Sequence, residues 1–137
     1  MTADQIALVK STFAAVAPNA PAVARLFYGR LFEIAPHYRA LFKADMDEQG
    51  KKLMQILAVA VNSLENLPAI VPAVQALGQR HVGYGVQAAD YQTVGAALLW
   101  TLEQGLGEGF TPEVKAAWAA TYTLLADTAV SGAHQTA

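Results

Sequence analysis

Cysteine is absent from this chain of 137 residues. Its absence excludes disulfide bonds, iron–sulfur clusters, thiolate-ligated iron and covalent attachment of haem through cysteine. Histidine is also scarce, with three in the whole sequence. No two of them fall at ligand spacing on one helix face, so the sequence gives no support to a zinc site.

Charge and long apolar runs are scarce as well. Charged residues make up 15% of the chain and the formal net charge is −2, without a basic stripe, so we expect no nucleic-acid partner. The strongest apolar run, residues 56–61, is far shorter than the 20 or so residues of a membrane span. The start of the chain also lacks the pattern of a signal peptide. We therefore expect a cytoplasmic protein without a membrane partner.

Apolar residues, in contrast, are plentiful, at 54% of the chain. We expect a single domain over residues 1–137, and a chain of this length buries roughly two-thirds of its unfolded surface. The apolar surplus favours one of two arrangements. Either the interior wraps a large apolar ligand, or the surface forms a subunit interface, so a monomer and a homodimer both remain open.

The spacing of apolar residues predicts an all-α protein of seven unequal helices. A capping box at Thr2 and Gln5 begins the first, and Pro18 ends it. The others are expected at 20–34, in a short turn at 36–42, at 47–64, in a segment ending at 81–82, at 91–106 with Asp90 as cap, and at 112–130, before a frayed tail. Glycine and proline corners between them favour steep crossings around a central pocket over an up-down bundle.

The same spacing predicts which residues face the core. The expected core positions are Ile6, Val9, Phe13 and Val16 in the first helix, Val23, Leu26, Phe27, Leu31 and Ile34 in the second, and Leu53, Leu57, Ala60 and Leu64 in the fourth.

His81 lies at the predicted end of a helix, where two interpretations compete. It could cap the last carbonyls of that helix, or its neutral imidazole could bind iron. His37, in a short turn, and His134, in the expected tail, are both predicted to be solvated.

Four residues on other predicted segments could line a pocket opposite His81: Tyr28, Phe42, Gln49 and Leu53. Gln49 and Leu53 are four residues apart and share a helix face. Each also has a plainer interpretation, such as core packing for Phe42 or a buried tyrosine bonded to a backbone carbonyl for Tyr28.

Taken in order, these residues and their neighbours resemble the globin family, and in particular single-domain bacterial haemoglobins related to the globin domain of flavohaemoglobins. The resemblance runs from about Gln5 to Asp127. It rests on the segments 27–32, 36–42, 65–68, 80–81, 91–95, 98–99 and 117–127, among them Phe27-Tyr28-Gly29-Arg30, Arg80-His81 and Ala117-Trp118.

The resemblance implies the globin fold, a three-on-three helical sandwich around a haem pocket, with haem b as cofactor. It implies His81 as the iron ligand and Tyr28 and Gln49 as distal polar residues. The remaining roles it implies are an apolar shell of Phe42, Leu53, Leu57 and Val94, propionate contacts from Lys52 and Arg80, and support of the proximal imidazole by the Leu77 carbonyl or by Tyr91.

The implied function is reversible binding of dioxygen, and of other diatomic gases, at ferrous iron for scavenging or storage. The alternative is a nitric oxide dioxygenase that depends on an external reductase. The sequence departs from flavohaemoglobins at one position: the glutamate expected in their proximal triad is Ala133 here. A peroxidase-like electronic push on the iron is therefore not expected.

Overall fold

The structure is a computed structural model that describes residues 2–41, 45–66, 71–76 and 88–134. Helix α1 spans Ala3–Val16 and begins with the predicted capping box, in which Thr2 and Gln5 exchange hydrogen bonds. A 3-10 turn, η1, follows at Ala17–Asn19 and contains Pro18. The proline thus ends the first helix as its fixed φ and missing N–H predict.

Helix α2 spans Ala20–Ile34, with Pro21 in its first turn, and the 3-10 helix η2 follows at Pro36–Leu41. Its buried residues are Val23, Ala24, Phe27, Tyr28 and Leu31. Leu26 and Ile34, predicted to face the core, are 39% and 43% exposed. The prediction was wrong there because Leu26 lies beside the buried stripe, and Ile34 is in the last turn of the helix.

Helix α3 spans Met46–Asn62, close to the predicted 47–64. Asp45 caps it by accepting a hydrogen bond from the backbone N–H of Asp47 at 2.9 Å. Residues 71–76 form a further helical segment, inside the range expected for the fifth helix.

Helix α5 spans Ala88–Leu106, the 3-10 turn η4 spans Gly107–Gly109, and helix α6 spans Pro112–His134. Asp90 therefore lies in the first turn of α5 and is not its cap, because the helix begins three residues earlier than predicted. Gly107 has a φ of 56°, a left-handed conformation that favours glycine. Helix α6 begins after Thr111, as predicted, but continues through Ser131 to His134, where the sequence suggested a frayed tail.

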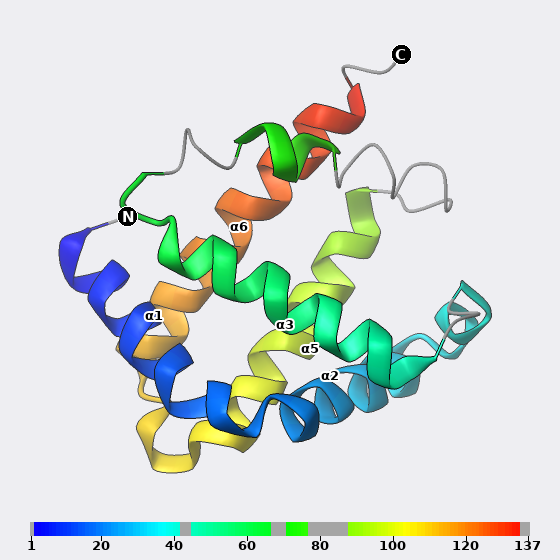
Figure 1. Cartoon of the computed structure of the whole chain (residues 1–137), viewed down its shortest axis with the longest axis horizontal. Helices are drawn as coiled ribbons and strands as arrows, with labels where there is room; N and C mark the ends of the chain where they lie inside the picture. Colours follow the sequence, from blue (N-terminus) through cyan, green and yellow to red (C-terminus); the bar gives the residue numbers. More distant parts are fainter. Residues whose placement is uncertain (1, 42–44, 67–70, 77–87, 135–137) are drawn as a thin grey trace.

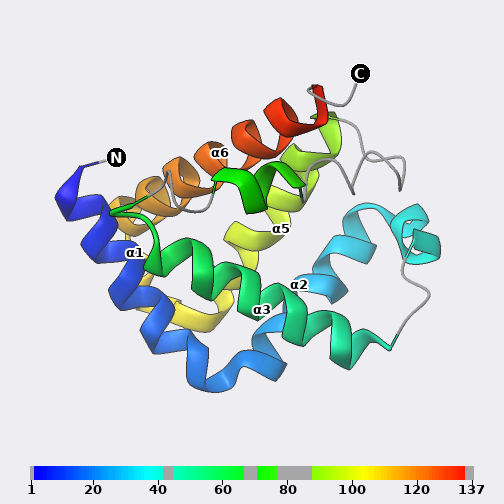
Figure 2. The same cartoon turned by 45° about the horizontal axis from the view of Figure 1, so that its top comes forward.

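The helices cross at steep angles and do not run side by side as in an up-down bundle (Figure 1). Helix α2 packs most extensively against α5 and then against α3, while α1 packs against α6. In Figure 1, α3 crosses in front of α5, with α1 to its left. Figure 2 shows the same helices from a view turned by 45°.

Among the described residues, one core cluster joins helices α1, α2, α3, α5 and α6. Trp118 is 1% exposed, and its indole N–H donates to the Thr12 hydroxyl at 2.8 Å, which ties α6 to α1. From the predicted seam of α3, Ala60 and Leu64 are buried, while Leu53 and Leu57 are half-buried against the same cluster.

By its length and composition alone, the stretch Ala3–Ile34 is long and apolar enough to cross a membrane. In the folded chain, however, it consists of α1, η1 and α2, broken at the turn that contains Pro18. Both helices supply residues to the core cluster. The expectation of no membrane partner stays a prediction.

Candidate functional site

Two polar side chains expected to share one pocket meet between α2 and α3. Tyr28, on α2, is 7% exposed, and its hydroxyl is hydrogen-bonded to the side chain of Gln49, on α3. Gln49 itself is half-buried, in the first turn of its helix. The tertiary fold therefore brings together the two residues that we expected on the distal side of a bound gas.

The ring of Tyr28 is held between two aromatic neighbours of its own helix. Its centroid lies 5.0 Å from that of Phe27, in an edge-to-face arrangement, and 6.0 Å from that of Phe32. Burial raises the pKa of Tyr28, while the hydrogen bond from Gln49 acts in the opposite direction. Tyr28 is thus a neutral hydroxyl at physiological pH, able to act as a hydrogen-bond donor.

The close approach of α2 and α3 depends on small residues beside this pair. A Cβ atom added to Gly50 would lie 2.8 Å from the Cβ of Ala24, a distance that real Cβ atoms essentially never show. A glycine inside a helix costs stability, so its presence often marks a close packing contact. This residue was missed by our sequence analysis, although its place inside a predicted helix was the available signal.

Three of the expected apolar pocket residues are half-buried: Leu53 and Leu57 on α3, and Val94 on α5. Each packs against the core cluster but keeps part of its surface exposed. Such a surface, together with the buried Tyr28 and the half-buried Gln49, suits an apolar, flat ligand whose reactive centre needs a hydrogen-bond donor. The described residues therefore fit a haem group.

A second polar cluster lies at the start of α5. Tyr38, on η2, donates a hydrogen bond to the carboxylate of Asp90, and Tyr122, on α6, donates to the backbone carbonyl of Tyr91 at 2.6 Å. Burial raises the pKa of Tyr38, Tyr91 and Tyr122. We did not predict this cluster, because no sequence spacing relates residues that lie 52 or 31 positions apart.

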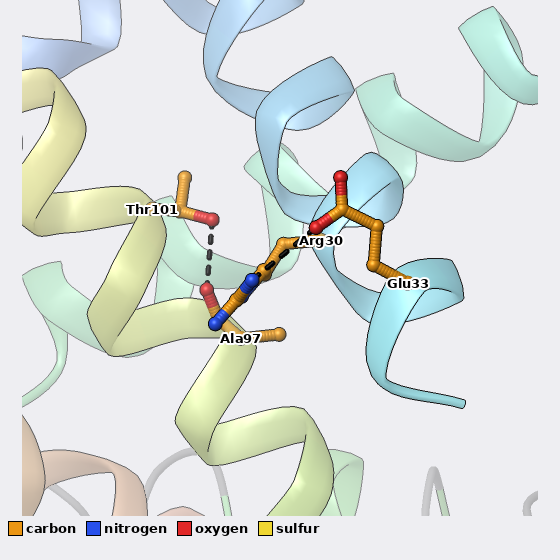
Figure 3. A network of polar contacts seen from close by, with 4 residues as sticks. All are labelled: Arg30, Glu33, Ala97 and Thr101. Carbon is orange, nitrogen blue, oxygen red and sulfur yellow. Dashed lines mark hydrogen bonds and ion pairs between the residues drawn. The ribbon is translucent and has the colours of Figure 1, made fainter. Parts of the chain in front are cut away.

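Arg30 lies at the crossing of α2 and α5, and Figure 3 shows its side chain extending from α2 toward α5. Its guanidinium pairs with Glu33 at 3.2 Å and lies 5.1 Å from the ring centroid of Trp100. Thr101, also at this crossing, donates back to the Ala97 carbonyl at 2.8 Å, so its buried hydroxyl is satisfied (Figure 3). Of these three contacts, the one between Arg30 and Trp100 joins α2 to α5, while the ion pair lies within α2 and the Thr101 bond within α5.

Several predicted site residues lie outside the described residues: Phe42, Leu77, Arg80 and His81. Lys52 is exposed on α3, and Tyr91 is half-buried on α5. His37 is exposed, as predicted. Within the described ranges, no group of three or more His, Asp or Glu side chains could hold a metal ion. The roles of these residues stay predictions.

Comparisons with known proteins agree on the class of protein to which this chain is similar. The globin family pattern matches residues 25–129 of the chain. The chain is 31% identical over 129 residues to the flavohemoprotein of Vibrio cholerae, which covers 92% of this chain and 33% of that protein. It is 36% identical over 125 residues to the flavohemoprotein of Bordetella parapertussis, covering 88% of this chain and 31% of that one.

The fold is similar to that of an engineered carbene transferase made from a putative nitric oxide dioxygenase of Rhodothermus marinus. The TM-score is 0.89 at 26% sequence identity, covering 99% of this chain and 95% of that one. The chain therefore belongs to the globin family and has the globin fold, as predicted. It spans about a third of the length of the flavohemoproteins that it matches.

Membership of this family implies haem b as the cofactor, in agreement with the sequence prediction. Haem binding and oxygen binding are general functions of globins. The finer question, which the family does not answer, is what this pocket does with the gas.

Proposed function

We propose that this globin binds dioxygen reversibly and holds it tightly, in a role of scavenging or storage. The observation that supports the proposal is the hydrogen bond between Tyr28 and Gln49, which brings two potential donors to one point between α2 and α3. Haem, when bound, supplies ferrous iron as the centre to which the gas attaches. The protein supplies the polar and apolar surroundings that determine how long the gas stays bound.

In this proposal, Tyr28 donates its hydroxyl proton in a hydrogen bond to the gas, and Gln49 orients the tyrosine by bonding to its oxygen. A hydrogen bond to a charged or strongly polarised acceptor contributes about 1.5–3 kcal/mol. Leu53, Leu57 and Val94 keep water away, and exclusion of water slows loss of the ferrous state. His81 is the proposed iron ligand.

The ligand assignment is tested by His81→Ala, with His37→Ala as the matched control, since His37 is exposed. The visible spectrum of the purified ferrous protein is the measurement. We expect His81→Ala to lose most of its haem, or to keep it only with added imidazole, and His37→Ala to be unchanged. Normal haem content and an unchanged ferrous spectrum in His81→Ala would refute the assignment.

A second candidate function is nitric oxide dioxygenation, which the flavohemoprotein relatives and the putative nitric oxide dioxygenase neighbour favour. Each nitrate formed from nitric oxide and dioxygen takes up one electron, which an external reductase would have to replace. The oxygenated protein alone should therefore consume one equivalent of nitric oxide and stop. Sustained consumption driven by NADH and a co-purifying reductase would favour the enzyme over the binding protein.

A further inference from the structure

The start of α5 is bonded to tyrosines from two other elements. Tyr38, on η2, donates its hydroxyl proton to the carboxylate of Asp90, and its hydroxyl is also hydrogen-bonded to the side chain of Thr93. Tyr122, on α6, donates to the backbone carbonyl of Tyr91 at 2.6 Å. The first turns of α5 are therefore tied to η2 and to α6 at the same time.

Both tyrosines are packed closely enough for these bonds to persist. Tyr38 is 8% exposed, and Tyr122 is half-buried. The ring of Tyr122 lies directly against the backbone of Gly95, where an added Cβ atom would be 2.7 Å from the ring. Water has little access to such hydroxyl groups, so breaking either bond would leave a polar group poorly satisfied.

The two tyrosines bind different sides of α5. With about 3.6 residues per turn, Asp90 and Thr93 share one side of this helix, whereas Gly95 lies on another. Tyr91 and Val94 lie between these two sides around the helix. Contacts on both flanks oppose rotation of α5 about its axis, so they fix the direction in which Tyr91 and Val94 point.

This face of α5 carries two residues expected at the haem: Tyr91, as a support of the proximal imidazole, and Val94, as part of the apolar shell. A hydrogen bond weakens steeply when its distance or angle leaves a narrow range. Partners that hold a metal-binding histidine orient its ring and make it a stronger ligand. A small displacement of the first turn of α5 would therefore weaken any bond from Tyr91 to the imidazole.

We propose that the Tyr38–Asp90 hydrogen bond is a positioning contact for Tyr91 and, through Tyr91, for the imidazole of His81. The roles of Tyr91 and His81 rest on the proposed function, whereas the attachment of Tyr38 to α5 rests on the contacts above. Tyr38 acts by holding the start of α5, so that the Tyr91 hydroxyl stays within reach of the imidazole. An imidazole bonded in this way donates more electron density to the iron.

The test is the iron–imidazole stretching frequency, measured by resonance Raman spectroscopy on the ferrous, gas-free, haem-loaded chain. Tyr38→Phe keeps the ring and removes the donor, so the band should shift to lower frequency and broaden. Tyr91→Phe should lower it at least as far. Tyr28→Phe is the matched control, because it removes a hydroxyl of similar burial, 7% against 8% exposed, from the distal side. It should leave this band in place, although it changes dioxygen release.

A double variant separates positioning of Tyr91 from a general loosening of the fold. If Tyr38 acts through Tyr91, Tyr38→Phe should add no further shift in the Tyr91→Phe background. Asp90→Asn keeps an oxygen that can accept from Tyr38, so its band should stay near the native frequency. Asp90→Ala removes the acceptor, and its band should fall as far as that of Tyr38→Phe.

Amide hydrogen exchange provides a second measurement that does not depend on haem. The amides of Val94 and Gly95 pair with helix carbonyls four residues earlier, at the start of α5. Their exchange should be several-fold faster in Tyr38→Phe than in the native chain, with or without haem, and unchanged exchange would overturn the attachment of Tyr38 to α5.

Three Raman results would overturn the positioning role. The first is an unchanged band in Tyr38→Phe, and the second is an equal shift by Tyr38→Phe with and without Tyr91. The third is an equal shift in Asp90→Asn and Asp90→Ala, which would assign the effect to the charge of the carboxylate. Absence of an iron–imidazole band in the native protein would instead refute the assignment of His81, and amide exchange would still test the attachment of Tyr38 to α5.

Discussion

Replacement of Tyr28 by phenylalanine tests the distal pair most directly. The ring sits among Phe27 and Phe32 at centroid distances of 5.0 and 6.0 Å, and a phenylalanine ring can keep both contacts. The substitution therefore removes one hydroxyl from a position that is 7% exposed and leaves the packing in place. Gln49 is half-buried, so water can replace its lost partner, and we expect stability to change by no more than about 1 kcal/mol.

The effect on dioxygen release should be much larger. Loss of a hydrogen bond to a strongly polarised acceptor costs about 1.5–3 kcal/mol. At about 1.4 kcal/mol per factor of ten, Tyr28→Phe should speed dioxygen dissociation by roughly 10- to 150-fold. We expect Tyr28 to contribute more than Gln49, because a packed aromatic side chain loses less entropy when held than a glutamine does.

Stopped-flow displacement of dioxygen by carbon monoxide measures this rate, and carbon monoxide release provides the control. Bound carbon monoxide is much less polarised than dioxygen and gains less from a donor. Tyr28→Phe should therefore affect dioxygen release far more than carbon monoxide release, and oxidation to the ferric state should quicken. Equal effects on both gases would mean that Tyr28 acts through the shape of the pocket. No effect on either gas would place Tyr28 outside the site.

Three further predictions concern the packing and the tyrosines. Gln49→Leu removes the hydrogen bond that lowers the pKa of Tyr28, so this pKa should rise further in an ultraviolet titration, and a fall would contradict the assigned bond. Because burial raises the pKa of Tyr122 above its ordinary value of 10.0, the unfolded chain loses that proton first. The free energy of unfolding should therefore stay level below about pH 10 and fall at higher pH, less steeply in Tyr122→Phe when followed by urea denaturation. Finally, a Cβ on Gly95 would lie 2.7 Å from the Tyr122 ring, so Gly95→Ala should destabilise the fold by about 1–3 kcal/mol, whereas Gly29→Ala, with open space around it, should not.

Local sequence signals predicted the helices well where their physical causes are local. The capping box at Thr2, the turn at Pro18 and the cap at Thr111 all depend on neighbouring residues, and all three lie where we predicted them. Errors arose at helix ends and edges. The starting point of α5 and the exposure of Leu26 depend on what packs nearby, which apolar periodicity alone does not contain.

The candidate site also divides into features that the sequence predicted and features that depend on tertiary packing. The sequence alone, through its resemblance to globins, identified Tyr28 and Gln49 as partners, and it indicated the haem class of the protein. Only the tertiary structure decided that their side chains meet, that Gly50 and Ala24 bring α2 and α3 into contact, and that tyrosines from η2 and α6 bind the start of α5. The reason is physical: periodicity along one helix specifies which face is apolar, whereas the separation of two helices depends on side chains from both, distant in sequence, packing at one crossing.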